Sequence, residues 1–480
     1  MRVEFQYDTK RKEVKIVSDY FSNIREHFSV KNPGARFNRF ARFIPQRIYS
    51  ITPAGYCDVG LVPEIKQHLD TLNVPFEYVN NDDLYNLLNK LPYKVSSLKE
   101  LDCSLKLRPY QKEAVETALQ RGHGTIVVGT GGGKTFIMAT LLNNIDFKMG
   151  KVLIIVPDIG LVAQTYKDFV SYGIPEHMIT KWTGSHEIDL SKNVIIANLG
   201  ILQSENSDIS WFNQVTCLFV DECHKLRHGN KVNKLIDKIP TFNRFGFTGT
   251  LPENPIDKWN IIGRLGQVIY EKTTSDLREE GEGQYIANAR GLSIKLEYDF
   301  KPDYTAVASS QRYLLELDYI HNSKFRNKVI RQLAVNFKNN CLILVDHIAH
   351  GTNLYNELST IPGKQVFFIQ GSVEVEDRRK VQEIMEQHNN VVCIAISKIF
   401  STGISIKNIH YIVFAAGGKS KIKTLQSIGR GLRIHENKDV LTLVDIVDDL
   451  IYGIKHYDKR KEFYDLENIK ITEKTITEST

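Results

Sequence analysis

The sequence predicts an α/β protein in which two tandem, doubly wound, mainly parallel sheets follow a small α+β domain. Apolar, β-branched segments alternate with helical patterns twice, from about residue 107 to 275 and again from about 340 to 448. Such alternation is typical of parallel sheets covered by helices. The first 95 residues instead show short alternating segments. The predicted domains are therefore 1–100, 101–275 and 276–450, followed by a polar helical tail at 451–480 whose end we expect to fray.

The N-terminal domain is predicted to be basic. Residues 1–50 carry eleven basic and five acidic side chains, and this excess equals the net charge of +6 of the whole chain. Alternating Val3, Phe5 and Tyr7 predict a strand, with a partner strand at 14–17 and helices at 20–28 and 61–72. A basic region on a near-neutral protein suggests a polyanionic partner such as DNA. A solvated basic face is the alternative.

Arginines and phenylalanines alternate within residues 36–43. Arg36, Arg39 and Arg42 are candidates for phosphate contacts, and the aromatic rings between them could stack on bases. The same period of two also fits a strand with phenylalanines facing inward and arginines facing outward. Both interpretations can hold, because an arginine-lined strand is itself a phosphate-binding surface.

In the first α/β domain the predicted strands are 125–128, 151–156, 193–197, 217–220 and 244–248. A glycine-rich loop separates the first strand from a helix. Within it, Thr130, Gly131, Gly132 and Gly133 would turn backbone N–H groups toward phosphates. Lys134 would reach the β- and γ-phosphates, and the Thr135 hydroxyl would ligate Mg²⁺. A glycine turn that merely joins strand to helix is the alternative, and the Lys-Thr pair favours the phosphate loop.

Two acids, Asp221 and Glu222, follow the strand at 217–220. Asp221 could hold Mg²⁺ and Glu222 could polarise an attacking water as general base. Two acids at a strand end are often incidental, but here they share a predicted sheet with Lys134. Upstream, Arg108 and Gln111 are candidates for nucleotide binding, since a glutamine amide can both donate to and accept from an adenine edge.

The second α/β domain has predicted strands at 341–345, 365–369, 391–395, 410–414 and 441–444. A strand-like segment at 292–300 and a long helix near 309–337 precede most of them. Arg430 and Arg433 are three residues apart on a helical pattern, so they would share one face. There they could stabilise charge on a γ-phosphate, although an exposed basic face would show the same spacing. Turns at 248–250 and 401–405 offer hydroxyl groups or are ordinary strand-end turns.

These segments together resemble superfamily 2 helicases of the DExH type. In order, they are 108–111, 130–135, 156–164, 221–224, 248–250, 401–405 and 426–433. Thr248 and Gly249 depart from the usual Ser and Ala, and Ser405 departs from the usual acid. The resemblance implies two RecA-like domains, ATP and Mg²⁺ as cofactors, Gly403 near the nucleotide, and Thr248 and Thr250 at the nucleic acid. It also implies strand-contacting loops at 157–164, 183–186, 198–203 and 346–351.

Residues 36–42, 400–408 and 419–422 are similar to phage helicases of the UvsW type. That similarity implies an ATP-dependent DNA helicase acting on branched DNA in phage replication, recombination and repair. Fork regression, branch migration and unwinding of R-loops or D-loops are the implied activities. The partner would be branched or duplex DNA with single-strand tracking, and no obligate protein partner is evident. The alternatives are an RNA helicase and a non-unwinding DNA translocase subunit of a restriction or remodelling complex.

Composition excludes other classes of protein. None of the six cysteines forms a Cys-x-x-Cys pair, so we expect buried, reduced thiols. No apolar run approaches the ~20 residues that a membrane helix needs. The first residues alternate like a strand and lack a signal-peptide core. We therefore expect a cytoplasmic protein, in the host-cell cytoplasm if it is encoded by a phage.

Overall fold

The computed structural model describes a large part of the chain in two compact units. Unit 1 contains residues 1–128 and 133–272, and unit 2 contains residues 129–132 and 273–480. The described residues are 2–36, 45–79, 82, 84, 98–204, 207–279, 286–400, 406–418, 428, 431, 432, 435, 438 and 440–479.

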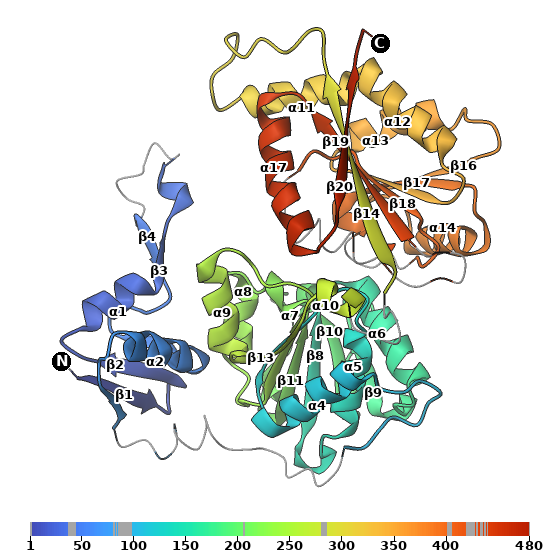
Figure 1. The fold of residues 1–480 in the computed structure, drawn as a ribbon. Coiled ribbons are helices and arrows are strands. Elements are labelled where there is room, and N and C mark those ends of the chain that lie inside the picture. The colour runs from blue at the N-terminus through green and yellow to red at the C-terminus, as the bar shows by residue number, and fades with distance from the viewer. Residues whose placement is uncertain are drawn as a thin grey trace. The chain divides into compact units, whose positions relative to one another are not determined.

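The N-terminal domain has a four-stranded mixed sheet in the order β5-β2-β1-β6. Figure 1 labels two of its strands, β1 and β2. Its strands are β1 (Val3–Asp8), β2 (Glu13–Val17), β5 (Tyr56–Asp58) and β6 (Phe76–Tyr78). The predicted pairing of β1 with β2 is confirmed and is antiparallel. Helices α1 (Phe21–His27) and α2 (Val62–Thr71) accompany this sheet, and β3 (Ser29–Lys31) and β4 (Arg47–Tyr49) form a separate hairpin. The segment in which arginines and phenylalanines alternate, residues 36–43, therefore lies in the sequence between the two strands of this hairpin.

The first α/β domain contains a seven-stranded sheet in the order β13-β7-β12-β11-β8-β10-β9, and all of its pairings are parallel. Its strands are β7 (Gly124–Val128), β8 (Lys151–Val156), β9 (Ile179–Trp182), β10 (Val194–Asn198), β11 (Val215–Asp221), β12 (Arg244–Thr248) and β13 (Val268–Lys272). The five predicted strands are present. The prediction missed β9 and β13, which form the two edges.

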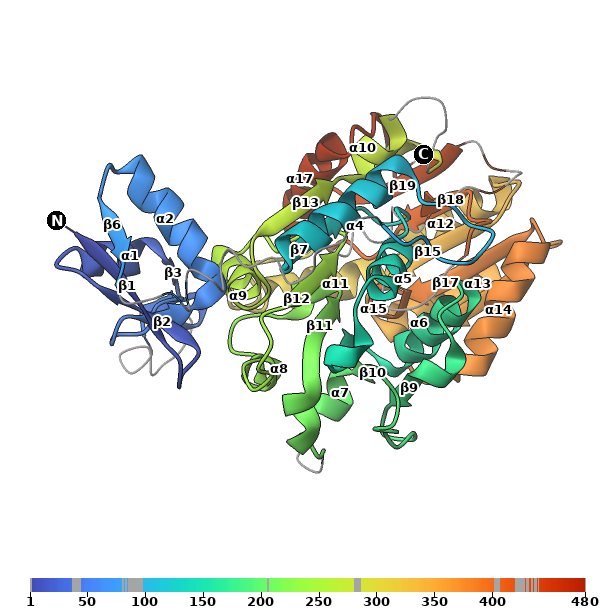
Figure 2. The same cartoon turned by 90° about the horizontal axis from the view of Figure 1, so that it is seen from below.

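Helices cover both faces of this sheet. Helices α7 (Leu199–Leu202), α8 (Lys231–Ile236) and α9 (Pro255–Leu265) share one apolar core with strand residues such as Leu153 and Val220. Helices α4 (Pro109–Arg121), α5 (Lys134–Asn143) and α6 (Ile159–Ser171) pack together along the other face (Figure 2). Because all seven strands are parallel, the loops after β7, β8, β10, β11 and β12 all emerge at the carboxyl ends of the strands.

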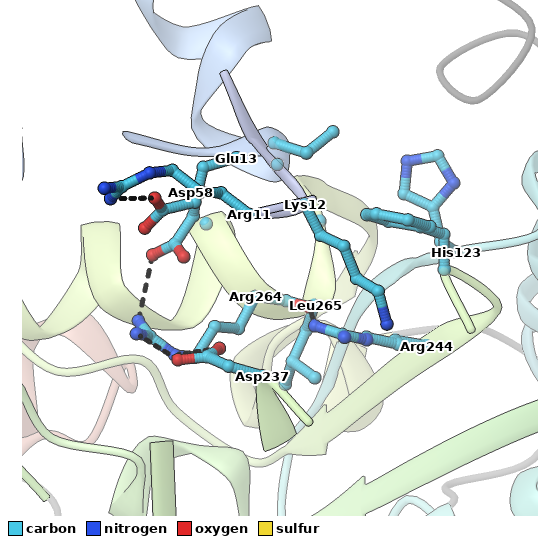
Figure 3. A pocket seen from close by; sticks show the side chains of 14 residues that line it. Arg11, Lys12, Glu13, Asp58, His123, Asp237, Arg244, Arg264 and Leu265 are labelled. Carbon is cyan, nitrogen blue, oxygen red and sulfur yellow. Dashed lines mark hydrogen bonds and ion pairs between the residues drawn. The ribbon is translucent and has the colours of Figure 1, made fainter. Parts of the chain in front are cut away.

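The N-terminal domain is docked on α9 through an ionic cluster (Figure 3). Arg264 of α9 places Nη1 2.9 Å from Asp58 Oδ2 and Nε 3.0 Å from Asp237 Oδ1. A Cβ at Gly263 would lie 2.8 Å from the Asp58 Cβ, so glycine allows the close approach. Burial raises the pKa of Asp58, and the Arg264 guanidinium opposes this rise. The cluster borders a small cavity of about 80 Å³ that Lys12, His123 and Arg244 also line.

The second α/β domain has a seven-stranded sheet in the order β16-β17-β15-β18-β19-β14-β20, again with parallel pairings throughout. Its strands are β14 (Asn288–Glu297), β15 (Cys341–Val345), β16 (Gln365–Ile369), β17 (Val391–Ile396), β18 (Tyr411–Phe414), β19 (Val440–Asp448) and β20 (Ile471–Thr477). Its helices, including the connecting helix, are α10 (Thr274–Glu279), α11 (Arg312–Asn322), α12 (Lys324–Asn336), α13 (Ile348–Leu358), α14 (Val375–Gln387), α15 (Ser397–Phe400) and α17 (Ile451–Leu466).

Two expectations for this domain are corrected. The long helix near 309–337 is two helices, because Ser323 has extended backbone and its side chain accepts from Arg326 N to cap α12. The tail does not fray, since β20 pairs with β14 as the outermost strand. Gly291 of β14 makes this pairing possible, because a Cβ there would lie 2.0 Å from Ile471 Cδ1.

The cysteine and membrane expectations can be compared with the structure. All six cysteines are free thiols, and every one except Cys103 is buried. Among the described residues, no helix combines the length and apolar character needed to cross a bilayer.

Candidate nucleotide-binding site

The glycine-rich loop links β7 to α5 with the backbone that a phosphate loop requires. Gly131 and Gly133 adopt positive φ values of 88° and 79°, a region in which side chains with a Cβ are strained. Gly132 N donates to Gly129 O at 3.0 Å and closes a turn. Helix α5 starts at Lys134 without a side-chain cap. Its first N–H groups are therefore available to an anion, as in other helix N-termini that bind phosphate.

Gln111 lies directly against this loop. A Cβ at Gly133 would be 2.4 Å from Gln111 Nε2, so the glycine is required by packing as well as by its φ value. The Gln111 side chain is buried, and its Oε1 accepts from Arg108 N at 3.0 Å at the start of α4. Arg108 Nη1 in turn lies 3.3 Å from the Tyr110 hydroxyl. Arg108 and Gln111, the two residues predicted to bind nucleotide, are thus held together by hydrogen bonds beside the loop.

Lys134 and Asp221 bring opposite charges together at the carboxyl ends of β7 and β11. Lys134 Nζ donates to Val128 O at 3.4 Å. Burial, followed by the charge of Glu222, raises the pKa of Asp221 from its ordinary 3.8 to about 7, while Lys134 opposes the rise. A carboxylate with a raised pKa is stabilised by a cation placed beside it.

These residues suit Mg²⁺ held mainly by substrate oxygens. Asp221 and Thr135 supply a carboxylate and a hydroxyl, which are oxygen ligands of the kind that Mg²⁺ prefers. Within the described parts of the chain, no group of three or more His, Cys, Asp or Glu side chains could form a protein-only metal cage. Magnesium in phosphoryl-transfer sites is usually bound by one or two carboxylates together with phosphates and water.

Glu222 is held in a strained conformation by its neighbours. Its φ of 48° lies in the left-handed region, which is uncommon for a residue with a side chain and is found often at functional sites. Its N–H donates to Asp221 Oδ1 at 2.9 Å. His224 Nδ1 lies 3.2 Å from Glu222 Oε2 and 2.9 Å from Thr248 Oγ1. This histidine therefore connects the candidate general base with the end of β12.

The nucleic-acid contact expected at Thr248 stays a prediction, and the structure describes the surroundings of this side chain. Its side chain is fully buried, its hydroxyl bonds to His224, and it also donates to Thr250 O at 2.9 Å. The strand-end hydroxyl thus lies beside His224, which in turn contacts Glu222. Thr250 is partly exposed and keeps its place in the adjoining turn. The role of His224 was missed, although a histidine beside two acids was its signal.

Several predicted residues lie outside the described part of the chain. These residues are Arg39, Arg42, Gly403, Arg430 and Arg433. Arg36 ends a short 3₁₀ turn, Pro33–Arg36, and only its backbone is described. Their assignments to DNA, nucleotide or transition-state contacts therefore remain predictions.

A basic and aromatic groove of about 610 Å³ lies between the β3–β4 hairpin and residues 228–234 of the first α/β domain. Lys234 and Trp259 of the first α/β domain line it together with residues of the N-terminal domain, among them Arg25, Arg47, Tyr49 and Tyr56. The Arg25 guanidinium carbon lies 3.6 Å from the centre of the Tyr49 ring. Asn233 is buried and its Oδ1 has no hydrogen-bond partner. Cations and aromatic rings together suit a nucleic-acid strand.

The loop expected to contact a strand at 157–164 follows β8. Asp158 caps α6 by accepting from Leu161 N at 3.0 Å, and Ile159 beside it is 55% exposed. In the second domain, α13 follows β15 in the same way and begins at Ile348, which is 56% exposed. Both helices thus start at the carboxyl end of a parallel strand with an exposed isoleucine. This is the sheet edge at which ligands bind in such folds.

Comparisons with known proteins match both α/β domains. The family model "Type III restriction enzyme, res subunit" matches residues 104–253, and "Helicase conserved C-terminal domain" matches residues 324–435. The chain is 30% identical over 467 residues to "ATP-dependent DNA helicase uvsW" of Enterobacteria phage T4, covering 93% of this chain and 90% of that protein.

More distant relatives include "DNA 3'-5' translocase XPB2" of Sulfurisphaera tokodaii, which is 24% identical. That match covers 75% of this chain and 85% of the relative. Among solved structures, S. cerevisiae Dbp5 bound to RNA and ADP BeF3 aligns with a TM-score of 0.55 and 14% identity. It covers 78% of this chain and 90% of Dbp5, and at this identity it indicates a shared fold alone.

Proposed function

Because the chain belongs to the UvsW family of superfamily 2 helicases, we propose that it is an ATP-dependent DNA helicase acting on branched DNA. The observation that carries the proposal is the cluster of Lys134, Asp221, Glu222 and Gln111 around the start of α5. A protein that only binds DNA has no use for a phosphate loop and a strained glutamate beside it. Fork regression, branch migration and R-loop or D-loop unwinding, within the host-cell cytoplasm, are the finer part of the proposal.

Each residue of the site has a distinct task in ATP hydrolysis. The N–H groups at the start of α5 and the Lys134 ammonium bind the phosphates. Asp221 and the Thr135 hydroxyl hold Mg²⁺, which when bound offsets charge on the phosphates. Glu222 accepts a proton from the attacking water, and His224 orients its carboxylate through the 3.2 Å contact. Gln111, with Arg108, reads the adenine edge, and Gly403 is assigned to the nucleotide by its motif.

Arg430 and Arg433 complete the proposed site from the second domain. Guanidinium groups facing the γ-phosphate would stabilise the charge that develops during transfer, a contribution that in other phosphoryl-transfer enzymes is worth about 10³–10⁵ in rate. Domain closure and opening, coupled to ATP hydrolysis, would then move DNA held across the strand ends. The exposed isoleucines that start α6 and α13 lie in the proposed contact loops.

The N-terminal domain is the proposed reader of duplex or branched DNA. Support comes from the basic, aromatic groove at the base of the β3–β4 hairpin, and from Arg36, Arg39 and Arg42 between its strands. The Arg264 cluster attaches the domain to α9. DNA bound there would therefore be held by the same unit that contains Lys134 and Glu222.

The test combines one variant with a panel of nucleic acids. Lys134→Ala should lose ATP hydrolysis while retaining DNA binding, because the proposal assigns this lysine to the phosphates of ATP and not to DNA. The wild-type protein should show ATPase activity stimulated more by forks, Holliday junctions and R-loops than by single-stranded RNA. Strand displacement by the isolated protein separates a helicase from a non-unwinding translocase. Substantial ATPase activity in Lys134→Ala would refute the assignment of this loop as the ATP-binding site. Preferential stimulation by RNA would favour an RNA helicase.

A further inference from the structure

The groove between the N-terminal domain and the first α/β domain has one wall from each of them. Residues 47–53, which include β4, form much of one wall, and residues 228–230 with Trp259 of α9 form much of the other. The rings of Trp259 and Phe28 pack across this junction with their centres 5.2 Å apart. The volume of about 610 Å³ falls within the roughly 300–1,000 Å³ of pockets that enclose small ligands. Such a space can take bases or nucleotides but is too small for a double helix.

Several charges of the lining are already paired within the protein. Glu13, Asp58 and Arg264 line both the groove and the smaller cavity drawn in Figure 3, so the ionic cluster lies where the two spaces meet. Arg264 Nη1 is 2.9 Å from Asp58 Oδ2, and Arg47 Nε is 2.8 Å from Glu26 Oε1. These two arginines serve the protein itself, and binding of phosphates depends on other cations.

Two cations of the lining, one on each wall, have no carboxylate partner among the residues that the structure describes. Arg25 Nε donates to Ile51 O at 3.1 Å, and its guanidinium carbon lies 3.6 Å from the centre of the Tyr49 ring. Lys234 of α8 is exposed and lines the groove from the other wall. A polyanion lying between the walls would therefore meet positive charge on both sides.

Aromatic and apolar side chains share this lining with the cations. Tyr49 and Trp259 come from opposite walls and are both partly exposed, and Ile48 and Pro53 add apolar surface. A double helix stacks its bases inside and presents mainly phosphates, which have no use for rings. Unpaired bases can stack on aromatic side chains, and this contact supports binding of single strands whatever their sequence.

We propose that this groove binds an unpaired segment of single-stranded DNA. The bases stack on Trp259 and Tyr49, and the phosphates pair with Arg25 and Lys234. Among the described residues, none of 157–164 lines the groove, so it is a single-strand site separate from that proposed contact loop.

This assignment rests on the proposed function and makes it more specific. Branched DNA has strands that leave a paired stem. The groove holds one such strand on the unit that contains Lys134 and Glu222.

The intrinsic fluorescence of Trp259 reports on the groove. The chain has three tryptophans, and Trp182 and Trp211 are 6% and 2% exposed and pack together with their ring centres 5.6 Å apart. Full-length protein without nucleotide is titrated with oligothymidylate of about 15 nucleotides and with a blunt duplex of the same length. We expect quenching by the single strand and little change with the duplex. Trp259→Phe should remove the quenching.

Variants on the two walls test the contacts while Trp259 stays in place. Tyr49→Leu should raise the oligothymidylate concentration needed for half of the quenching about tenfold, and Lys234→Ala should raise it about threefold. Tyr49→Phe keeps the ring and should match wild type. The controls are Phe300→Leu, at a ring that is 82% exposed in the second domain, and Lys238→Ala, outside the groove. Because the variants lie on separate walls, a folding defect in one leaves the other informative.

Three outcomes would overturn the proposal while leaving the function intact. The first is no quenching by oligothymidylate although DNA stimulates ATP hydrolysis. The second is equal quenching by the duplex, which would make the groove a duplex-binding surface. The third is an unchanged titration midpoint in both Tyr49→Leu and Lys234→Ala. Absence of DNA-stimulated ATPase activity in the wild-type protein would instead refute the proposed function, and the fluorescence titration is independent of that result because it needs no ATP.

Discussion

Replacing Asp221 by asparagine should stabilise the nucleotide-free protein while abolishing its ATPase activity. Burial and the Glu222 charge raise the pKa of Asp221 from 3.8 to about 7. A carboxyl whose pKa is higher folded than unfolded adds full stability below the unfolded pKa, and that contribution is lost as the pH rises to the folded pKa. Above pH 7 the ionised aspartate therefore opposes folding. Asparagine removes the charge and can still accept from Glu222 N, which donates to Asp221 Oδ1 at 2.9 Å.

The expected gain follows from the size of the pKa change. At about 1.4 kcal/mol for each tenfold change in an equilibrium, a rise from 3.8 to about 7 corresponds to an upper limit of about 4 kcal/mol. Asp221 is partly solvent-exposed, and water reduces the penalty, so we expect about 1–3 kcal/mol at pH 8. The gain should be smaller at pH 5, where part of the folded aspartate is protonated and so carries no charge.

Denaturant unfolding at pH 5 and pH 8 measures the effect, with ATP turnover recorded on the same samples. Glu253→Gln, at an exposed loop position, is the control and should leave stability unchanged at both pH values. A stabilisation by Asp221→Asn that is equal at pH 5 and pH 8 would refute the electrostatic reasoning. Retained ATP turnover would refute the role of Asp221 in holding Mg²⁺.

Three further predictions concern the loop, the domain junction and the groove. Gly133→Ala should weaken ATP binding and destabilise the fold by about 1–3 kcal/mol, because Gly133 has a φ of 79° and an added Cβ would meet Gln111 Nε2. Nucleotide titrations and thermal melts measure the two effects. Gly371→Ala, where an added Cβ would meet no other atom, should change neither. Arg264→Met should lower the free energy of unfolding by about 3 kcal/mol, because Asp58 and Asp237 lose this partner. It should also speed the proteolytic separation of the N-terminal domain. Lys258→Met, at an exposed position of the same helix, should do neither. Lys234→Ala should lower DNA affinity and flatten the slope of log affinity against log salt by about 0.9, with Lys238→Ala, outside the groove, as the unchanged control.

Central strands could be predicted from sequence because both of their faces are buried. The five predicted strands of the first sheet are rich in apolar, β-branched residues. In the two seven-stranded sheets, the missed strands β9, β13 and β20 all lie at sheet edges, where one side is open and polar residues are tolerated. Their formation depends on a neighbour, as with Ile471 of β20 beside Gly291.

Site residues could be predicted where the chemistry needs a particular residue type at a particular spacing. Lys134, Asp221 and Glu222 are examples. The direction of a side chain at a strand end was not predictable, and the burial of Thr248 against His224 became apparent only in the structure.

The pairing of β20 with β14 has a consequence for synthesis of the protein on the ribosome. Strand β14 is made early, at Asn288–Glu297, but its outer neighbour comes only with Ile471–Thr477. Domains generally fold as units during translation, so the first sheet can be complete long before this strand emerges. Until then β14 has an open edge of the kind that invites wrong pairing. Translation that stalls before residue 471 would therefore release a nucleotide-binding domain attached to an aggregation-prone second domain, and complete synthesis closes that edge.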